Sequence, residues 1–438
     1  MKTGIYLLFL CEVCVEISKA DTKPKIPKEE ENFLPRNKNV NISEEWDPHE
    51  NVPKPFEKQF PEEFTLYNFT EKTANFGFNL YRKIAMTHDK NVVFSPLSVS
   101  ALMATYMFAA KGETHSQIVK GLNLHTLKDR ENRHYLPALF KQLKDNITMN
   151  EELLLVQGTL SFIQKGFRLR QSFLNLSKHY FDMEFLSVDF QNITQAKFVI
   201  NQNINKRTKG KIPELFENLD RHNKLLLVDY IFFKGKWLYP FNAKFTEIET
   251  FHINKYRSVQ VPMMFKSDKV TSTFDENLRC NVIKLPYQGK AHMLVAIPEK
   301  EADYISLEDH LTTELVEAWL RSMKTRKVDI SFPKFKLEQK YEMKKLLHAL
   351  GIKNLFARTA DLSHLTDQGY IKVSQVVQKA AIEVDEKGTE ATAASGSEVT
   401  AFSVPPVIKV DRPFLFMIFE ETYKTLLFMG RVVDPTEL

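Results

Sequence analysis

The chain has 438 residues, of which 43% are hydrophobic, 26% charged and 12% aromatic, and its formal net charge at pH 7 is +5. These proportions are normal for a soluble globular protein, and the length allows one large domain or two to three average ones. The net charge is too small to indicate nucleic-acid binding by itself, so a polyanion site would require a local cluster of cations.

Residues 1–20 predict a secretory signal peptide. Lys2 supplies the positive start, residues 5–10 form a short apolar core, and residues 18–20 (Ser-Lys-Ala) resemble a small-x-small cleavage site. Two glutamates inside the segment are unusual, so an uncleaved cytosolic start is the alternative. No later stretch reaches the ~18 apolar residues of a membrane span.

The cysteines do not predict redox chemistry or a disulfide. Cys11 and Cys14 form a CxxC pair, but both fall inside the predicted signal peptide. Cys280 is then the only cysteine of the mature chain, at what resembles the entry to a strand. We expect a small core residue there; a reactive thiol is the alternative, although no cationic neighbours are evident in the sequence.

The region after the signal peptide differs from the rest of the chain. Residues 21–63 are rich in Pro, Glu, Lys and Asn, a composition that cannot bury enough apolar surface to order itself, so we predict a disordered tail. The globular domain is expected at 64–438. Five N-x-S/T triplets together with a signal peptide predict a secreted glycoprotein, with candidate sites Asn41, Asn68, Asn146, Asn175 and Asn192.

Helical patterns come first along the domain and strand patterns dominate later. Residues 68–90 have helical spacing of apolar residues, and residues 91–112 predict a strand, a Ser-Pro turn and a buried helix. Short helices are expected at 115–124 and 131–146, and amphipathic helices at 307–323 and 342–352; strands are expected at 153–164, 225–237, 281–287, 291–299, 327–340, 414–421 and 425–433. This segregation predicts a single α+β domain.

The sequence contains no recognised catalytic or metal-binding motif. It has no HExxH, Walker loop, GxGxxG after a strand or GxSxG elbow. Four histidines lie close in sequence without consistent ligand spacing, namely His88, His115, His125 and His134. We therefore expect neither an enzyme nor a metal site.

The segment EVDEKGTEATAASGSEVTAFSVPP at 383–406 lies between two strand-like stretches. With a period of two, one face of 389–399 is small and neutral, while Glu390 and Glu398 share the other face. Such a segment could enter a sheet late, because its small face has a low cost of burial. A flexible loop is the simpler interpretation of the composition alone, and the shared parity of two glutamates adds only modest support.

The hinge sequence IEVDEKGTEATAAS resembles the reactive-centre loop of the serpin family. Further ordered segments resemble the same family, including NVVFSPLSVSALM, INQNINKRTKGKIPELF, LLLVDYIFFKGKWLYPF, IKLPYQGKAHMLVAIPE, FPKFKLEQKYEMKKLLHALGI and DRPFLFMIFEETYKTLLFMGRVVDP. The resemblance covers about residues 70–435. It implies an α+β serpin fold with three β-sheets, about nine helices, an exposed loop at about 386–406 and a metastable native state whose stability is kinetic.

The resemblance also implies a suicide-substrate mechanism. A serine protease attacks the bond Phe402–Ser403, forms an acyl-enzyme, and is trapped when the freed loop inserts into the main sheet. The hinge residues implied by the family spacing are Gly388, Thr389, Glu390, Ala391, Thr392, Ala393 and Ala394. A Phe402 packed on the body and a non-inhibitory carrier are the alternatives. Asp229 departs from the Asn that is common in the family.

The long polar tail, the aromatic-Ser pair at the predicted scissile bond and four segments resemble, within this family, an inhibitor of blood coagulation. The segments are TANFGFNLYRKIAMTHDK, LVDYIFFKGKW, PMMFKSDKVTSTFDENLRC and VEAWLRSMKTRKVD. That resemblance implies factor Xa as a target, accelerated by protein Z, calcium and a phospholipid surface, and factor XIa as a cofactor-independent target. The chain itself would be a plasma monomer that reaches membranes only through protein Z. Trypsin-like proteases prefer Arg in their acidic primary pocket, so Phe402 leaves that acid unpaired; a chymotrypsin-like target is the alternative.

Two surface sites are expected from the resemblance. A face for protein Z is implied at Met86, Asp89, Tyr256 and Asp309, with a core position for Met86 and helix-end roles for the aspartates as alternatives. A cluster of cations predicts binding of a heparin-like glycan as an accelerator, although solvated helix faces carry similar charges: Lys120, Lys128, Arg130, Arg133, Lys141 and Lys144. No intrinsic cofactor is expected.

Overall fold

The structure is a computed structural model, and it describes residues 66–127, 135–148, 152–300, 304–368, 371–387 and 405–437. Within these residues helices and strands are segregated along the chain, which confirms the predicted α+β class. Nine α-helices occur in the described ranges, as expected: α1 (Leu66–Ala85), α2 (Pro96–Ala109), α3 (Gly112–Gly121), α4 (Tyr135–Thr148), α5 (Gln171–Phe181), α6 (Ile193–Arg207), α7 (Tyr304–His310), α8 (Thr313–Ser322) and α9 (Met343–Ala349).

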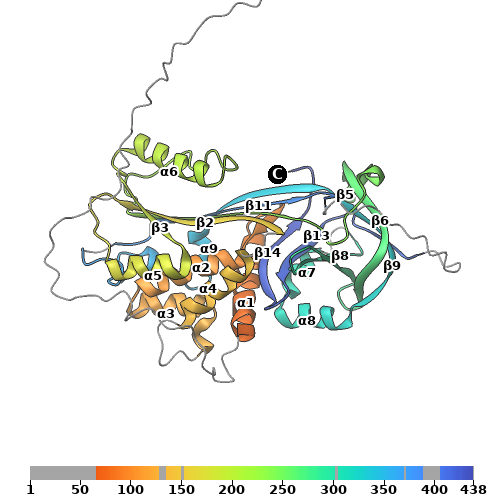
Figure 1. Cartoon of the computed structure of the whole chain (residues 1–438), viewed down its shortest axis with the longest axis horizontal. Helices are drawn as coiled ribbons and strands as arrows, with labels where there is room; N and C mark the ends of the chain where they lie inside the picture. The colour runs from red at the N-terminus through yellow and green to blue at the C-terminus, as the bar shows by residue number, and fades with distance from the viewer. Residues whose placement is uncertain are drawn as a thin grey trace, which may run out of the picture. The chain divides into compact units, whose positions relative to one another are not determined.

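A five-stranded sheet runs through the centre of this domain. Its order is β10 (Phe335–Glu342), β11 (Gln375–Val384), β4 (Leu225–Gly235), β2 (Leu153–Gln164) and β3 (Glu184–Val188). The neighbours β11 and β4 are parallel, whereas β10 is antiparallel to β11 and β2 is antiparallel to β4. Figure 1 shows α6 over one face of this sheet, with α2 and α5 on the other.

The remaining strands form one hydrogen-bonded network of nine. Its order is β1 (Val92–Phe94), β14 (Thr425–Val432), β13 (Phe414–Glu420), β8 (Ala291–Pro298), β7 (Cys280–Pro286), β6 (Arg257–Asp275), β9 (Lys324–Pro333) and β12 (Val407–Lys409), with β5 (Glu247–Asn254) paired to β6. The long β6 pairs with β7 through residues 271–275 and with β9 through residues 263–272. Two of the three expected sheets therefore share one continuous strand.

Helix α2 shows why the most apolar helical segment lies inside the domain. Ser95 caps its N-terminus by accepting a hydrogen bond from the Ser98 amide at 3.3 Å, and Pro96 occupies the first turn, where its missing N–H costs nothing. Its buried residues extend around most of the helix, so it packs against other elements on several sides.

Cys280 at the start of β7 is fully buried, which confirms the expected core position. Burial raises the pKa of its thiol to about 12, so the thiolate needed for reactivity is not populated at neutral pH. The alternative of a reactive cysteine is therefore wrong. Among the described helices, none has the length and apolar character needed to cross a bilayer.

Candidate functional site

The predicted reactive-centre loop, or bait loop, joins the described domain at two points. We call these two points its roots: residues 385–387 after β11, and residues 405–409, which include β12. The predicted scissile pair Phe402–Ser403 and the predicted hinge residues Gly388 to Ala394 fall outside the described residues. The chain enters the loop from β11 through residues 385–387 and leaves it at Pro405, just before β12. The site must therefore be built from these roots and from the sheet beside them.

Backbone hydrogen bonds fix the first root to the segment that follows β4. The Trp237 indole N–H donates to the Asp385 carbonyl at 2.8 Å, and the Trp237 amide donates to the Lys387 carbonyl at 3.2 Å. The Phe241 amide donates to the Glu386 carbonyl, also at 3.2 Å. Both aromatic rings are buried, so the root rests on packed core.

Glu386 adds side-chain contacts to the same root. Its carboxylate pairs with Lys334 Nζ at 2.9 Å and accepts a hydrogen bond from Thr246 Oγ1 at 2.9 Å. Burial raises the pKa of Glu386, but these contacts outweigh it and hold the pKa below its usual value. The carboxylate is therefore ionised and bonded immediately before the loop begins.

The second root is a short parallel pairing at the other end of the loop. Strand β12 pairs with β9 through three residues, from Val407 opposite Asp329 to Lys409 opposite Ser331. The Asp329 amide also donates to the Pro406 carbonyl at 3.0 Å. Lys409 pairs with Glu249 of β5 at 2.6 Å, so this root is joined to the same region of the domain.

The seam between β11 and β4 is where the sheet could accept another strand. The two strands pair in parallel through eight residue pairs, from Gln375 opposite Leu226 to Ile382 opposite Phe233. A strand that turned back from the end of β11 would run antiparallel to both neighbours. Parallel pairing is slightly weaker per residue than antiparallel pairing, so this replacement is favourable for the backbone.

A buried carboxylate lies in the middle of this seam. Ser98 Oγ of α2 donates to Asp229 Oδ2 at 2.5 Å, and Gln378 Nε2 of β11 donates to the same oxygen at 2.7 Å. Burial raises the pKa of Asp229 to about 6, although hydrogen bonds pull it the other way. These named partners are neutral, so at neutral pH they hold the ionised Asp229 by hydrogen bonds and supply no countercharge.

Gln378 connects the same cluster to the start of α2. Its side-chain amide accepts from the Ser95 amide and donates to the Ser95 carbonyl, both at 3.2 Å. Because Gln378 is on β11 and Asp229 is on β4, separating the two strands must break their mutual hydrogen bond. The sequence identified Asp229 as unusual, but it did not indicate which groups surround it.

Charged side chains also cross the seam on its outer face. Lys234 at the end of β4 forms ion pairs with Glu383 of β11 and with Asp385, the latter at 2.7 Å. Burial lowers the pKa of Lys234, but the two carboxylates more than reverse this and raise it overall. These pairs would also have to separate if a strand entered between β4 and β11.

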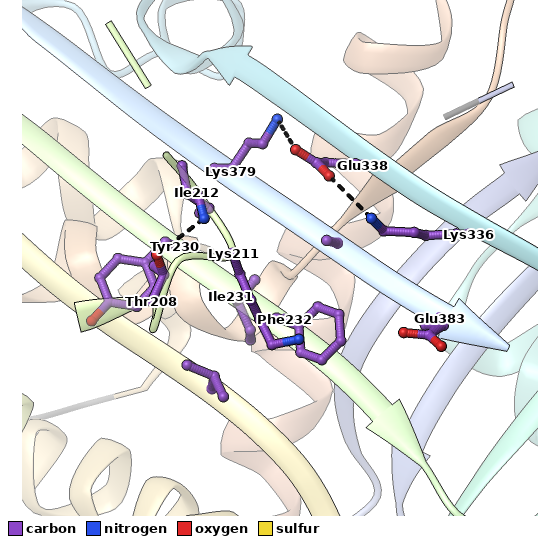
Figure 2. Close-up of a pocket in the computed structure, with 12 residues that line it drawn as sticks. Thr208, Lys211, Ile212, Tyr230, Ile231, Phe232, Lys336, Glu338, Lys379 and Glu383 are labelled. Atoms are coloured by element: carbon purple, nitrogen blue, oxygen red, sulfur yellow. Dashed lines mark hydrogen bonds and ion pairs between the residues drawn. The ribbon is translucent and has the colours of Figure 1, made fainter. Parts of the chain in front are cut away.

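A hollow of about 550 Å³ lies over the same seam (Figure 2). Figure 2 shows Glu338 between two lysines, with Lys379 Nζ at 2.7 Å and Lys336 Nζ at 3.8 Å. Lys211 lies 4.0 Å from the centre of the Phe232 ring. The lining residues are mainly apolar and charged, and they include no Ser, Cys or His.

The four residues predicted for a partner face belong to one part of the surface. Met86 and Tyr256 are 77% and 86% exposed, so the alternative of a core position for Met86 is wrong. Asp89 lines a hollow of about 840 Å³ together with residues adjacent to Tyr256 and with Ile305 of α7. Asp309 is on α7, four residues after Ile305 and therefore on the same face of that helix.

Sequence reasoning missed Ile305 on this face. Its side chain is 56% exposed, although an Ile in a helix would ordinarily be assigned to the core. The face rests on a buried ionic cluster, in which Arg431 Nη1 pairs with Glu308 at 2.8 Å and Tyr81 donates to Glu308 at 2.6 Å. The buried Glu308 of α7 thus holds the helix that presents Asp309.

The predicted heparin cluster is only partly described. Lys128, Arg130 and Arg133 lie outside the described residues, while Lys120 is in the last turn of α3 and two further lysines lie on α4. Lys141 pairs with Asp145 at 3.2 Å, and Lys144 pairs with Asp182. These carboxylates reduce the positive field of α4, and glycan binding stays a prediction.

The predicted glycosylation sites differ in exposure. Asn175 of α5 and Asn192 at the start of α6 are exposed, whereas Asn68 and Asn146 are half-buried on α1 and α4. Asn192 also caps α6, because its side-chain oxygen accepts from the Gln195 amide at 3.2 Å. Asn41 lies outside the described residues, and occupancy of all five sites stays a prediction.

Comparison with known proteins agrees with the resemblance seen in the sequence. The family model described as serpin (serine protease inhibitor) matches residues 71–435. The protein Z-dependent protease inhibitor of Homo sapiens is 55% identical over 369 residues, which cover 84% of this chain and 83% of that protein.

Two solved structures show the same fold. The mouse protein Z-dependent protease inhibitor has a TM-score of 0.80 at 51% identity and covers 86% of this chain and 100% of its own. Human thyroxine-binding globulin has a TM-score of 0.78 at 35% identity and covers 85% of this chain and 100% of its own. On the family match, the level of identity and the shared fold, the chain belongs to the serpin family of serine protease inhibitors.

Proposed function

We propose that this chain is a secreted inhibitor that offers residues 388–404 as bait to a serine protease and traps it covalently. The observation that carries the proposal is the arrangement of the seam. Strand β11 leads directly into the loop. A strand that returns from the end of β11 could enter between β11 and β4 and pair antiparallel with both, in place of their parallel pairing. Family membership supports the same mechanism.

The covalent step uses the nucleophile of the protease. Its serine oxygen attacks the Phe402 carbonyl carbon, an ester bond forms, and the peptide bond to Ser403 breaks. The Ser403 amine leaves with a proton delivered by the histidine of the protease. Insertion of the freed segment into the seam then carries the ester-linked protease away before water can hydrolyse the ester.

The outer face of the inserted strand would not be open to water along its whole length. Ile212 and Phe216, from the segment between α6 and β4, share a buried cluster with Val228 of β4 and Val377 of β11. An entering strand must therefore pass beneath this segment. The small outward residues in the middle of the loop, Thr392, Ala394 and Gly396, suit that passage, and the two glutamates flank them in sequence.

We further propose factor Xa as a target, with protein Z, calcium and a phospholipid surface as accelerators, and factor XIa as a target that needs no cofactor. The names of the relatives at 52–55% identity support a dependence on protein Z, and the exposed Tyr256 supplies a common kind of interface anchor. A cofactor that binds both proteins on a membrane raises their effective concentration, which compensates for a poor bait residue. A heparin-like glycan is proposed as a further accelerator.

Phe402 itself favours a second candidate, a chymotrypsin-like protease that needs no cofactor, because an aromatic side chain fits an apolar primary pocket. Inhibition rates measured with factor Xa, in the presence and absence of protein Z, calcium and phospholipid vesicles, discriminate the two. We expect a large acceleration by the complete mixture. Equal factor Xa rates, with faster inhibition of chymotrypsin, would favour the second candidate.

The inhibitory mechanism is tested by electrophoresis under denaturing conditions. Incubation with a susceptible protease should give a complex of about the summed masses that survives SDS. Cleaved chain beside fully active protease would instead favour a carrier. Thr389→Arg should convert the inhibitor into a substrate, because insertion would then bury a charge; an unchanged complex yield would contradict the insertion of this residue.

A further inference from the structure

We propose that exposed apolar side chains beside the first loop root form a docking surface for the attacking protease, an inference that rests on the proposed inhibitory function. Leu238, Tyr239, Phe245 and Ile248 lie within one short stretch, and between 47% and 66% of each residue is exposed. We call these four residues the apolar collar. They lie outside the bait sequence and outside the predicted protein Z face.

The collar belongs to the same stretch that holds the loop root. Trp237, directly before the collar, donates to the carbonyls of Asp385 and Lys387. Thr246, between two collar residues, donates to Glu386. The inward side chains of the stretch therefore fix the root, while the collar residues point outward next to it.

The collar also lies near the second root. Ile248 is followed by Glu249, whose carboxylate pairs with Lys409 Nζ at 2.6 Å. Lys409 belongs to the second root and is two residues after Val407 in the chain. Val407 is itself 66% exposed. Both points at which the loop joins the domain are thus accompanied by uncovered apolar side chains.

Exposed large apolar residues are concentrated rather than scattered. Eleven such residues occur in the described ranges. Five of them are the collar residues and Val407, two (Met86 and Tyr256) belong to the predicted protein Z face, and Ile305 is on α7 beside that face. The four collar residues fall within residues 238–248, and exposed apolar side chains that gather in one region of a soluble protein commonly mark an interaction site. The concentration beside the loop therefore indicates a second contact surface.

The geometry of the loop selects the protease as occupant. The predicted bond after Phe402 is three residues from Pro405, a reach of about 10 Å along the chain. A serine protease domain of ~230 residues is about 45 Å across. Because the protease is much wider than this reach, a protease whose active site binds the bond after Phe402 extends over the loop roots. Its surface around the active site then lies over the collar.

The chemistry supports the same occupant. Phe402 is a weak primary residue for a trypsin-like pocket, so binding energy has to come from contacts away from that pocket. Apolar and aromatic side chains supply such energy efficiently, because burying them releases water without leaving a charge unpaired. The partner surface should therefore be apolar or aromatic rather than strongly charged.

The inference is tested with the double variant Leu238→Ser/Tyr239→Ser and with Ile248→Thr. The matched control is Phe198→Ser on α6, which removes a 63% exposed aromatic residue away from the loop roots. Association rate constants are measured with chymotrypsin, and with factor Xa in the presence of protein Z, phospholipid vesicles and calcium. Thermal midpoints check that each variant is folded.

We expect the double variant to slow association about tenfold with at least one of these proteases, equivalent to ~1.4 kcal/mol, and the control to stay within about twofold. The number of inhibitor molecules consumed per trapped protease should not change, because the loop and the seam are untouched. Rates for the collar variants that match the control would overturn the docking surface alone. Failure of the unaltered chain to form any SDS-stable complex would overturn the proposed function and the docking surface with it.

Discussion

Replacing Asp229 by Asn should stabilise the native protein at neutral pH and remove part of its pH dependence. The carboxyl is fully buried, and its pKa is raised by burial from 3.8 to about 6. Because the folded-state pKa is above the unfolded value, the contribution of this carboxyl to stability is fully present below pH 3.8 and is lost as the pH rises through 6. At pH 7.5 the ionised group lowers the free energy of unfolding by about 3 kcal/mol relative to its protonated form.

The Asn side chain has the same shape and can accept the hydrogen bonds from Ser98 and Gln378 without a charge. We expect Asp229→Asn to raise the thermal midpoint at pH 7.5 by up to about 4 °C for a domain of this size. At pH 5 the gain should shrink, because the unaltered carboxyl is then largely protonated. Scanning calorimetry at both pH values measures this difference.

The control is Glu217→Gln, which neutralises an exposed carboxylate outside the seam and should change neither midpoint. A gain of equal size at pH 5 and pH 7.5 would show that charge burial is not the cause. No gain at pH 7.5 would show that the hydrogen bonds fully compensate the buried charge.

Three further changes test other parts of the structure. Glu386→Lys replaces the ion pair with Lys334 by a repulsion, so we expect premature loop insertion or self-association, seen as a lower monomer yield on size-exclusion chromatography. Tyr256→Ala removes an 86% exposed aromatic residue, and should weaken binding of protein Z at least tenfold by calorimetry without changing the thermal midpoint. Arg431→Met leaves Glu308 buried and unpaired, and should cost about 3–5 kcal/mol in a denaturant titration; a loss below ~1 kcal/mol would contradict that reasoning.

The sequence predicted the fold class because local signals and the family resemblance agreed. Single elements were predicted less well: the helix expected at 307–323 is two helices, α7 and α8, and α5 and α6 were not expected. The buried helix at 96–109, the core position of Cys280 and the α+β class followed from apolar runs, a Ser-Pro start and the segregation of helices and strands. The shared use of β6 by two of the three sheets was not predicted. It depends on how one long strand exchanges partners along its length, which no local pattern encodes.

The candidate site was predicted less completely, because its chemistry depends on distant neighbours. Asp229 was recognised as unusual, yet its partner Gln378 is 149 positions further along the chain. Ile305 and the apolar collar could not be told from core residues in the sequence. Residue type and periodicity indicate that a side chain is apolar, but they do not show whether another part of the chain covers it. Met86 and Tyr256 are the exposed apolar residues that the resemblance indicated, and both are uncovered.

The distribution of charge along the seam indicates where the closed sheet is held. In its middle, ionised Asp229 has neutral named partners and lowers stability, whereas at the loop end Lys234 and Lys334 pair with carboxylates on or just beyond β11. The interactions that resist premature insertion are therefore concentrated at the end of the seam where a cleaved loop would enter. Asp229→Asn and Glu386→Lys then act on separate groups with no shared partner, so their effects on the free energy of unfolding, measured on the monomer that remains, should add. A double variant that departs from the sum by more than about 0.5 kcal/mol would show that the middle of the seam and the loop root open as one unit.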